Sequence, residues 1–229
     1  MKTSLLAKSL PWAITALLFM PVVALLMSAF QIDESGSFNH LMRTVLLDYS
    51  VNTVLLMLGV MLLSFCFAFP VAWFIACCDF PSRKVLQWAL MLPLAIPPYI
   101  IAIVYTDLFD FSGPVQGFLR ELMQWQSASD YYFPDLRTLE GAIFELSLAL
   151  YPYLYLLLLG AFLGESGHLF QAARSLGRSP LSAFISVSLP LSRSAIAIGL
   201  SLIAMETLAD FATVNYVGVS TLTTAVYDT

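Results

Sequence analysis

The sequence predicts an all-α membrane protein, a polytopic bundle of spanning helices. Of its 229 residues, 59% are hydrophobic and only 11% are charged, whereas soluble domains carry roughly 25% charged residues. Five runs with few or no charges are long enough to cross about 30 Å of hydrocarbon. They are continuous rather than alternating, which favours helices over a barrel. The five expected spans are about 10–30, 51–78, 85–106, 141–164 and 194–219.

The first run follows Lys2 and Lys8. It is longer than the roughly 7–15 apolar residues of a secretory signal, so we interpret it as a retained anchor. With the loop after it, this run makes a first part, 1–48, and the other four runs make a second part, 49–229. The three cysteines lie in or at the end of the second run without metal-ligand spacing, and we interpret them as apolar fillers.

The basic residues predict the orientation, because cytoplasmic loops carry an excess of Lys and Arg. With the N-terminus inside, the inner segments hold Lys2, Lys8, Arg83, Lys84, Arg174, Arg178 and Arg193, and the outer segments hold Arg43, Arg120 and Arg137. We therefore expect a cytoplasmic N-terminus. A fifth span would leave 220–229 outside, and we expect the sequence to stop before a sixth span.

The inner segment 165–192 contains FQAARSLGRSPLSAFISVSLP, starting at Phe170. Ser179 and Pro180 are typical of a helix start, and Gly177 can end the preceding helix in a left-handed conformation. We therefore expect two short helices with an elbow. The second helix should carry one apolar face, made of Leu181, Phe184, Ile185 and Leu189. Either the segment docks on another protein or it lies on the inner leaflet as an amphipathic helix.

This segment resembles the cytoplasmic "EAA" loop of ABC importer permeases, whose pattern is Glu-Ala-Ala, three residues, Gly, nine residues, Ile, one residue, Leu-Pro. The departures are Gln171 for glutamate and Val187 for isoleucine. In that family the loop inserts into a groove on an ATP-hydrolysing subunit, so the resemblance implies docking. The implied coupling residues are Gln171, Ala172, Ala173, Arg174, Gly177, Val187, Leu189 and Pro190.

The resemblance implies a type 1 transmembrane domain over 49–229, incomplete at its C-terminal end, in a bacterial inner membrane. It implies three partners: an ATP-binding subunit present as a homodimer, a periplasmic substrate-binding protein, and a second permease half in the same parent chain or a separate subunit. Membrane lipid surrounds the chain, and ATP is expected on the partner. The absence of a phosphate-loop motif agrees with a chain that is not an enzyme and binds no cofactor, and no basic patch with aromatics suggests nucleic acid.

Stretches starting at Leu92, Leu148 and Ala204 resemble the ferric-iron branch of these permeases. The resemblance therefore implies ferric iron as the cargo. Thiamine, a polyamine or an oxyanion are alternative cargos for the same kind of permease. A membrane scaffold that transports nothing and binds lipid through its inner helix is the alternative from another class.

Several acidic residues, whose transfer into a membrane costs free energy, lie inside the expected spans. Glu206 and Asp210 are four residues apart, which predicts two carboxyls on one helix face. They either line the translocation path, where they would attract a cation such as ferric iron, or they cap neighbouring helix ends, bond to Asn215 or Tyr216, or are protonated. Glu145 lies one turn into its span, where we expect it to reach water. The sequence assigns no catalytic residue and no firm metal site.

Prolines 93, 97, 98 and 152 should bend or break their spans. Tyrosines beside these positions, Tyr99 and Tyr105 among them, either form a gate with the kinked spans or only pack. The outer loop 107–140 is either a docking surface or a cap on the helix ends, and we favour the cap.

Overall fold

The computed structural model describes residues 46–125 and 127–227, together with six separate positions between 12 and 23. The first expected span, 10–30, lies outside the described residues apart from those positions. The chain divides into two units, Met1–Val45 and Leu46–Thr229.

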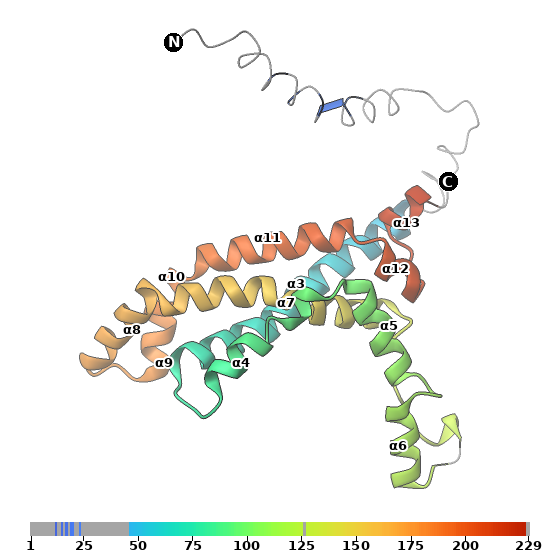
Figure 1. Ribbon diagram of the computed structural model, residues 1–229, viewed down its shortest axis with the longest axis horizontal. Coiled ribbons are helices and arrows are strands. Elements are labelled where there is room, and N and C mark those ends of the chain that lie inside the picture. Colours follow the sequence, from blue (N-terminus) through green and yellow to red (C-terminus); the bar gives the residue numbers. More distant parts are fainter. Residues whose placement is uncertain are drawn as a thin grey trace, which may run out of the picture. The chain divides into compact units, whose positions relative to one another are not determined.

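The expected all-α class is confirmed, because every regular element in the second unit is helical (Figure 1). The long helices are α3 (Leu46–Cys77), α7 (Leu139–Leu163) and α11 (Arg193–Ala209). The shorter α-helices are α4 (Arg83–Ala89), α5 (Pro98–Phe109), α6 (Pro114–Met123), α8 (Glu165–Ser175), α9 (Pro180–Ala183), α10 (Leu189–Leu191), α12 (Ala212–Val217) and α13 (Leu222–Tyr227). Two 3-10 turns, η1 (Leu92–Ala95) and η2 (Ala128–Asp130), and one π-helical turn, η3 (Phe184–Ser188), complete the set.

The second and fourth expected spans are confirmed as continuous helices, α3 and α7, each long and apolar enough to cross a membrane. One stripe of α3 is buried along its whole length, made of Thr53, Leu56, Val60, Ser64, Ala68, Ala72 and Ile75. Small side chains recur in it, which lets membrane helices approach closely. Gly199 likewise lets α11 approach α7 closely, because it lies directly against Leu154 of α7. The core is therefore the three-helix contact of α3, α7 and α11.

The third expected span is not one helix. Pro97 is extended between η1 and α5, and the segments Arg83–Ala95 and Pro98–Met123 are bent by 101°. The break leaves backbone carbonyls around the end of α4 without their usual helical partners, and two tyrosines of α7 donate hydrogen bonds to them. Tyr151 Oη donates to Leu90 O at 2.9 Å and Tyr155 Oη to Gln87 O at 3.2 Å. These tyrosines thus repair a broken helix, which is how membrane proteins tolerate proline breaks.

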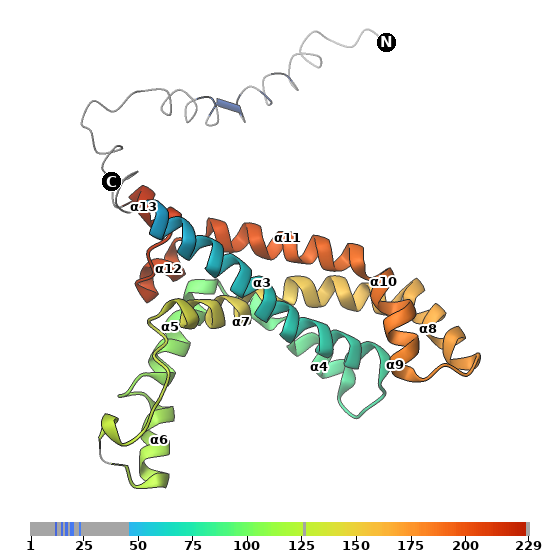
Figure 2. The same cartoon turned by 180° about the vertical axis from the view of Figure 1, so that it is seen from behind.

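The fifth expected span, 194–219, is also divided. The helix α11 ends at Ala209, Asp210 is extended with ψ 121°, and α12 follows after Phe211. On the other side of α11, the segment Pro180–Leu191 meets the helix at a bend of 61°. Counting each bent pair as one span, the described residues of the second unit hold up to four candidate spans. Figure 2 shows the α5–α6 arm leaving the long helices near one end of the bundle and α8–α9 lying at the other.

Candidate coupling hairpin and acidic cavity

The inner segment folds as the expected pair of short helices with an elbow, α8 and α9. Gly177 lies between them with φ +86°, so the left-handed helix end expected there is confirmed. Its N–H donates to Arg174 O at 3.0 Å, and Arg178 N donates to Ala173 O at 3.1 Å. These two bonds satisfy carbonyls at the end of α8, as a left-handed helix end normally does.

The start of α9 is capped as the sequence predicts. The Ser179 hydroxyl accepts from Ser182 N at 3.2 Å, and Pro180 is the first helical residue. Across the elbow, Arg178 Nη1 donates to Ser186 Oγ at 2.8 Å, and Arg174 Nη1 donates to Arg178 O at 3.1 Å. Arg174 therefore ties α8 to the elbow, and Arg178 ties the elbow to the second arm.

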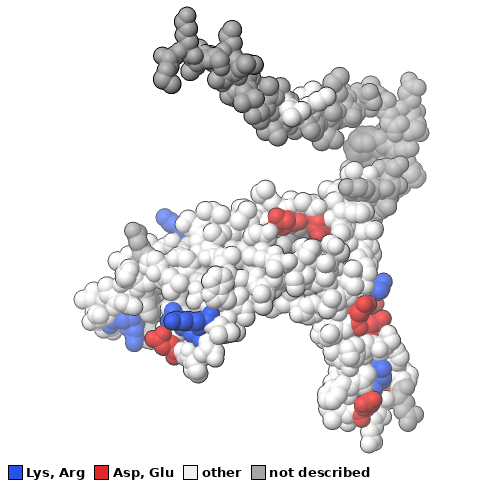
Figure 3. All heavy atoms as spheres, in the orientation of Figure 1, with Lys and Arg blue, Asp and Glu red and all other residues white. Residues whose placement is uncertain are grey.

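The implied coupling residues are mostly on the surface of the hairpin. Gln171, Ala172, Arg174, Gly177 and Pro190 are exposed, and Ala173, Val187 and Leu189 are half-buried. Large apolar side chains stand exposed among them, namely Leu169 (50%), Leu176 (86%), Leu181 (66%) and Ile185 (55%). The hairpin thus presents apolar and basic groups together. Figure 3 shows Lys and Arg gathered over the end of the bundle that holds α4, α8 and α9.

The expected single apolar face of the second hairpin helix is divided between two environments. Leu181 and Ile185 point to the surface, whereas the ring of Phe184 packs against the core. It lies 5.5 Å from the Phe69 ring and 5.1 Å from the Trp73 ring, both on α3. It also lies 6.3 Å from the ring of Phe162 on α7. Phe184 therefore joins the hairpin to both long helices, a role that the sequence analysis missed.

A signal for this contact was present in the sequence. Phe65, Phe69 and Trp73 are spaced four residues apart, so a helix places them on one side. Phe184 is the last aromatic residue of the inner segment before Arg193, close to where the following span begins. An aromatic row on one element and a single ring on another are candidates for contact.

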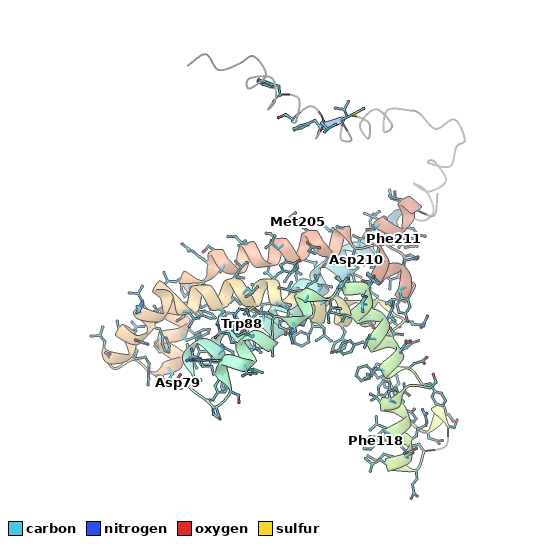
Figure 4. All side chains as sticks on the ribbon, in the orientation of Figure 1. Asp79, Trp88, Phe118, Met205, Asp210 and Phe211 are labelled. Atoms are coloured by element: carbon cyan, nitrogen blue, oxygen red, sulfur yellow. The ribbon has the colours of Figure 1, made fainter. Side chains whose placement is uncertain are left out.

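Glu206 and Asp210 line one cavity of 340 Å³ near the α5 break, together with Pro98, Leu146, Leu150, Ala209, Phe211 and Ala212. Figure 4 labels Asp210 and Phe211 at the junction of α11 and α12. The prediction that both carboxyls project from one face of one helix is wrong, because α11 ends before Asp210. The two acids share the cavity for a different reason, which is that the chain turns there.

The Asp210 carboxylate caps α12. Its Oδ1 accepts from Thr213 N at 2.9 Å and from Val214 N at 3.3 Å, and its Oδ2 accepts from Thr213 Oγ1 at 3.0 Å. This matches the helix-capping alternative considered from the sequence. Glu206 is exposed on α11. Tyr99 is exposed at the start of α5, and Tyr105 stacks on Phe109 with centroids 6.0 Å apart, so neither tyrosine is among the residues that line this cavity.

We expect Asp210→Ala to destabilise the second unit by about 1 kcal/mol, the usual cost of losing a helix cap. Asp210→Asn should retain most of that stability, because asparagine caps as well as aspartate. Thermal unfolding in detergent measures the difference. The transport rate of Asp210→Asn then tests the charge. If Asp210→Asn is as stable as wild type but loses as much transport activity as Asp210→Ala, Asp210 belongs to the path rather than to the cap. Glu206→Gln is the matched control on the same cavity.

Glu145 does not reach water as expected. Its side chain is 1% exposed between α7 and its neighbours, and its Oε1 accepts from Thr106 Oγ1 of α5 at 2.9 Å. Its Oε2 has no hydrogen-bond partner. The expectation failed because it counted helical turns from the end of the span and ignored the packing of α5 across α7.

Within the described ranges, no group of three or more His, Cys, Asp or Glu side chains lies close enough to hold a metal ion. The acids of the cavity number two, and one of them is engaged as a helix cap. The arrangement in this part of the chain can flank a polar path but offers no cage of oxygen ligands.

Candidate membrane spans with a structured hairpin between two of them define a polytopic helical membrane protein, and the comparisons name its class. The chain is 30% identical over 179 residues to the molybdenum transport system permease protein ModB of Escherichia coli K12, covering 76% of this chain and 74% of that protein. It is 28% identical to a probable molybdenum ABC transporter permease protein of Haloferax volcanii, covering 73% of this chain and 57% of that protein.

It is also 24% identical to the sulfate transport system permease protein CysW of Escherichia coli K12, covering 88% of this chain and 66% of that protein. No family model matches the chain. The chain belongs to the family of ABC transporter permeases, which are transport components and not enzymes. These relatives are named for molybdenum and sulfate and not for iron, the cargo that the sequence analysis favoured.

Proposed function

We propose that the chain is the membrane permease of an ATP-driven importer whose cargo is an oxyanion of the molybdate or sulfate class. The observation that carries the proposal is the similarity to permeases named for molybdenum and sulfate transport. It replaces ferric iron with the oxyanion alternative. ATP is bound and hydrolysed by a partner subunit, and a periplasmic binding protein delivers the cargo.

The chemistry of the cavity is compatible with this cargo. The Pro97 break directs the N-terminal end of α5 to the cavity, since Pro98 lines it. Such helix ends carry partial positive charge, and broken membrane helices use them toward anions. The neighbouring carboxylates repel an oxyanion, which keeps binding weak. Weak binding suits a path, because a carried ion must leave as well as enter.

The hairpin is the proposed contact with the ATP-hydrolysing partner. Gln171, Ala172 and Gly177 form its exposed rim beside the half-buried Ala173, and the apolar and basic side chains around them fit a protein groove. When the partner subunits close on ATP, they push on the hairpin. Phe184 then transmits the displacement to α3 and α7 through the aromatic contacts. The broken spans reorient, which alternates access between the two sides.

The remaining assignments follow from the same proposal. The hairpin faces the cytoplasm, in agreement with the basic residues at that end of the bundle. The domain over 49–229 is the type 1 transmembrane domain of a bacterial inner-membrane importer, paired with a second permease half. Glu206 and Asp210 flank the path beside the break in the third span.

The test is the hydrolysis of ATP by the complete complex reconstituted in lipid vesicles with its binding protein. We expect molybdate or sulfate to raise the hydrolysis rate, and ferric iron, thiamine and a polyamine to leave it at its basal level. Stimulation by ferric iron alone would reverse the cargo assignment. Purification of the permease without any nucleotide-hydrolysing subunit would instead favour the scaffold alternative.

A further inference from the structure

The α5–α6 arm leaves the bundle nearly at a right angle. Residues Arg83–Ala95 and Pro98–Met123 are bent by 101°, and α4 lies alongside the long helices in both ribbon views (Figures 1 and 2). Because α3 and α7 cross the bilayer, an arm at this angle runs close to the membrane plane. The arm and the coupling hairpin lie at opposite ends of the bundle. The arm therefore lies at the leaflet opposite the hairpin.

The helix α6 has two distinct sides. One side is tied to the rest of the arm, where Gln116 Nε2 donates to Phe109 O at 2.7 Å and Arg120 Nη1 donates to Phe111 O at 2.7 Å. The other side carries Phe118 (65% exposed) and Leu122 (62%), which are four residues apart and so share one face. Figure 4 shows Phe118 projecting from α6 on the side toward α4. For a bundle that crosses the bilayer, that side is the hydrocarbon.

Two further features beside α6 suit a lipid boundary. The rings of Trp125 and Tyr131 stack with centroids 4.5 Å apart, and Tyr132 is 91% exposed. Trp and Tyr are enriched where hydrocarbon meets headgroups. A cavity of 290 Å³ lies between the arm and the start of α7, lined by Phe109, Phe133, Pro134, Asp135, Leu136, Glu140, Gly141 and Phe144, with almost entirely apolar walls.

We propose that α6 is an interfacial helix that lies in the leaflet opposite the hairpin, with Phe118 and Leu122 in contact with phospholipid acyl chains. The apolar cavity receives the end of one such chain. The occupant is lipid, because the face continues the apolar surface of the membrane bundle and points along it toward the hydrocarbon. This helix anchors the arm laterally, and the proposal takes the place of the helix-end cap favoured from the sequence.

Site-directed spin labels test the depth of this face in the full-length chain, within its complete complex in phospholipid nanodiscs. The background is Cys66→Ala, Cys77→Ala and Cys78→Ala, which removes the three native cysteines. Phe118→Cys and Leu122→Cys place labels on the proposed lipid face. Gln124→Cys, exposed directly after α6 and two residues beyond Leu122, lies on the other side of the helix and is the matched control. The readout is the ratio of accessibility to oxygen, which concentrates in hydrocarbon, over accessibility to a water-soluble nickel complex.

We expect a ratio several-fold higher at 118 and 122 than at 124, and Val115→Cys, three residues before Phe118, gives a third label on the same face if either variant fails to fold. Equal ratios at all positions, with the labels open to the nickel complex, would place α6 in water and overturn the proposal. Labels at 118 and 122 shielded from both reagents would assign the face to a protein partner and overturn it equally. The cargo assignment is unaffected by either result.

Discussion

Gly177→Pro is expected to abolish association of the chain with its ATP-hydrolysing partner. Proline fixes φ near −65°, whereas Gly177 has φ +86°. Proline also removes the N–H that donates to Arg174 O at the end of α8. The elbow must therefore rearrange, and the exposed rim of the hairpin loses the shape that we propose the partner groove accepts.

Gly177→Ala measures the same effect in graded form. No atom lies within 4 Å of an added Cβ at this position, so the alanine variant suffers only from the left-handed backbone. That conformation costs about 1–2 kcal/mol for a residue with a side chain, or a roughly 5–30-fold smaller population of the native elbow. We expect co-purification of the ATP-binding subunit to fall in the order glycine, alanine, proline.

Gly160→Ala is the matched control for this series. An added Cβ at Gly160 also meets nothing within 4 Å, and the residue lies inside α7 with no left-handed backbone. It should leave both co-purification and ATP hydrolysis at wild-type levels. Full association of the proline variant with the partner would show that the elbow is not part of the coupling surface.

The hairpin could be predicted from sequence because its signals are local. A serine cap, a proline in the first turn and a glycine at the elbow each act on the backbone within four residues of themselves. A short stretch of sequence therefore determines the local backbone conformation, and the structure has all three features where they were expected. The long apolar runs that became α3 and α7 are equally local, because length and hydropathy alone define them.

The helix breaks and the contacts across the bundle could not be predicted in the same way. Three prolines within six residues predicted a bend or break in the third span. The size of the bend, however, depends on whether neighbouring side chains donate hydrogen bonds to the carbonyls that lose their helical partners. Tyr151 and Tyr155 do so from α7, more than sixty residues away in sequence. Asp210 similarly ends one helix and caps the next, and the spacing of four from Glu206 concealed this.

The expected ferric-iron cargo is not supported by the relatives, for a related reason. The stretches that suggested ferric iron are membrane helices, whose sequences are constrained by the bilayer whatever they carry. Two carboxylates in a span suggested a cation, but a pair of acids is specific only when both are free to bind. In the structure one carboxylate accepts three hydrogen bonds from its own chain. The similarity to permeases named for molybdenum and sulfate carries more information than that pair.

Glu145→Ala is expected to lower the stability of the bundle strongly. The side chain is 1% exposed, so its removal leaves a cavity, and truncating a buried side chain of this size to alanine costs about 2–5 kcal/mol. It also leaves the Thr106 hydroxyl without its acceptor in the contact between α5 and α7. Thermal unfolding in detergent, followed by circular dichroism, measures the loss.

Two nearly isosteric variants separate the hydrogen bond from the volume. Thr106→Val keeps the shape of the threonine side chain but removes the donor, which leaves the buried Glu145 Oε1 unpaired as well as Oε2. An unsatisfied buried polar group costs about 1–3 kcal/mol, so this variant should fall between wild type and Glu145→Ala. Glu145→Gln retains a carbonyl oxygen for Thr106 and should stay close to wild type. If Thr106→Val were as stable as wild type, the bond would not hold α5 on α7, and the position of the broken span would have to rest on the tyrosine contacts alone.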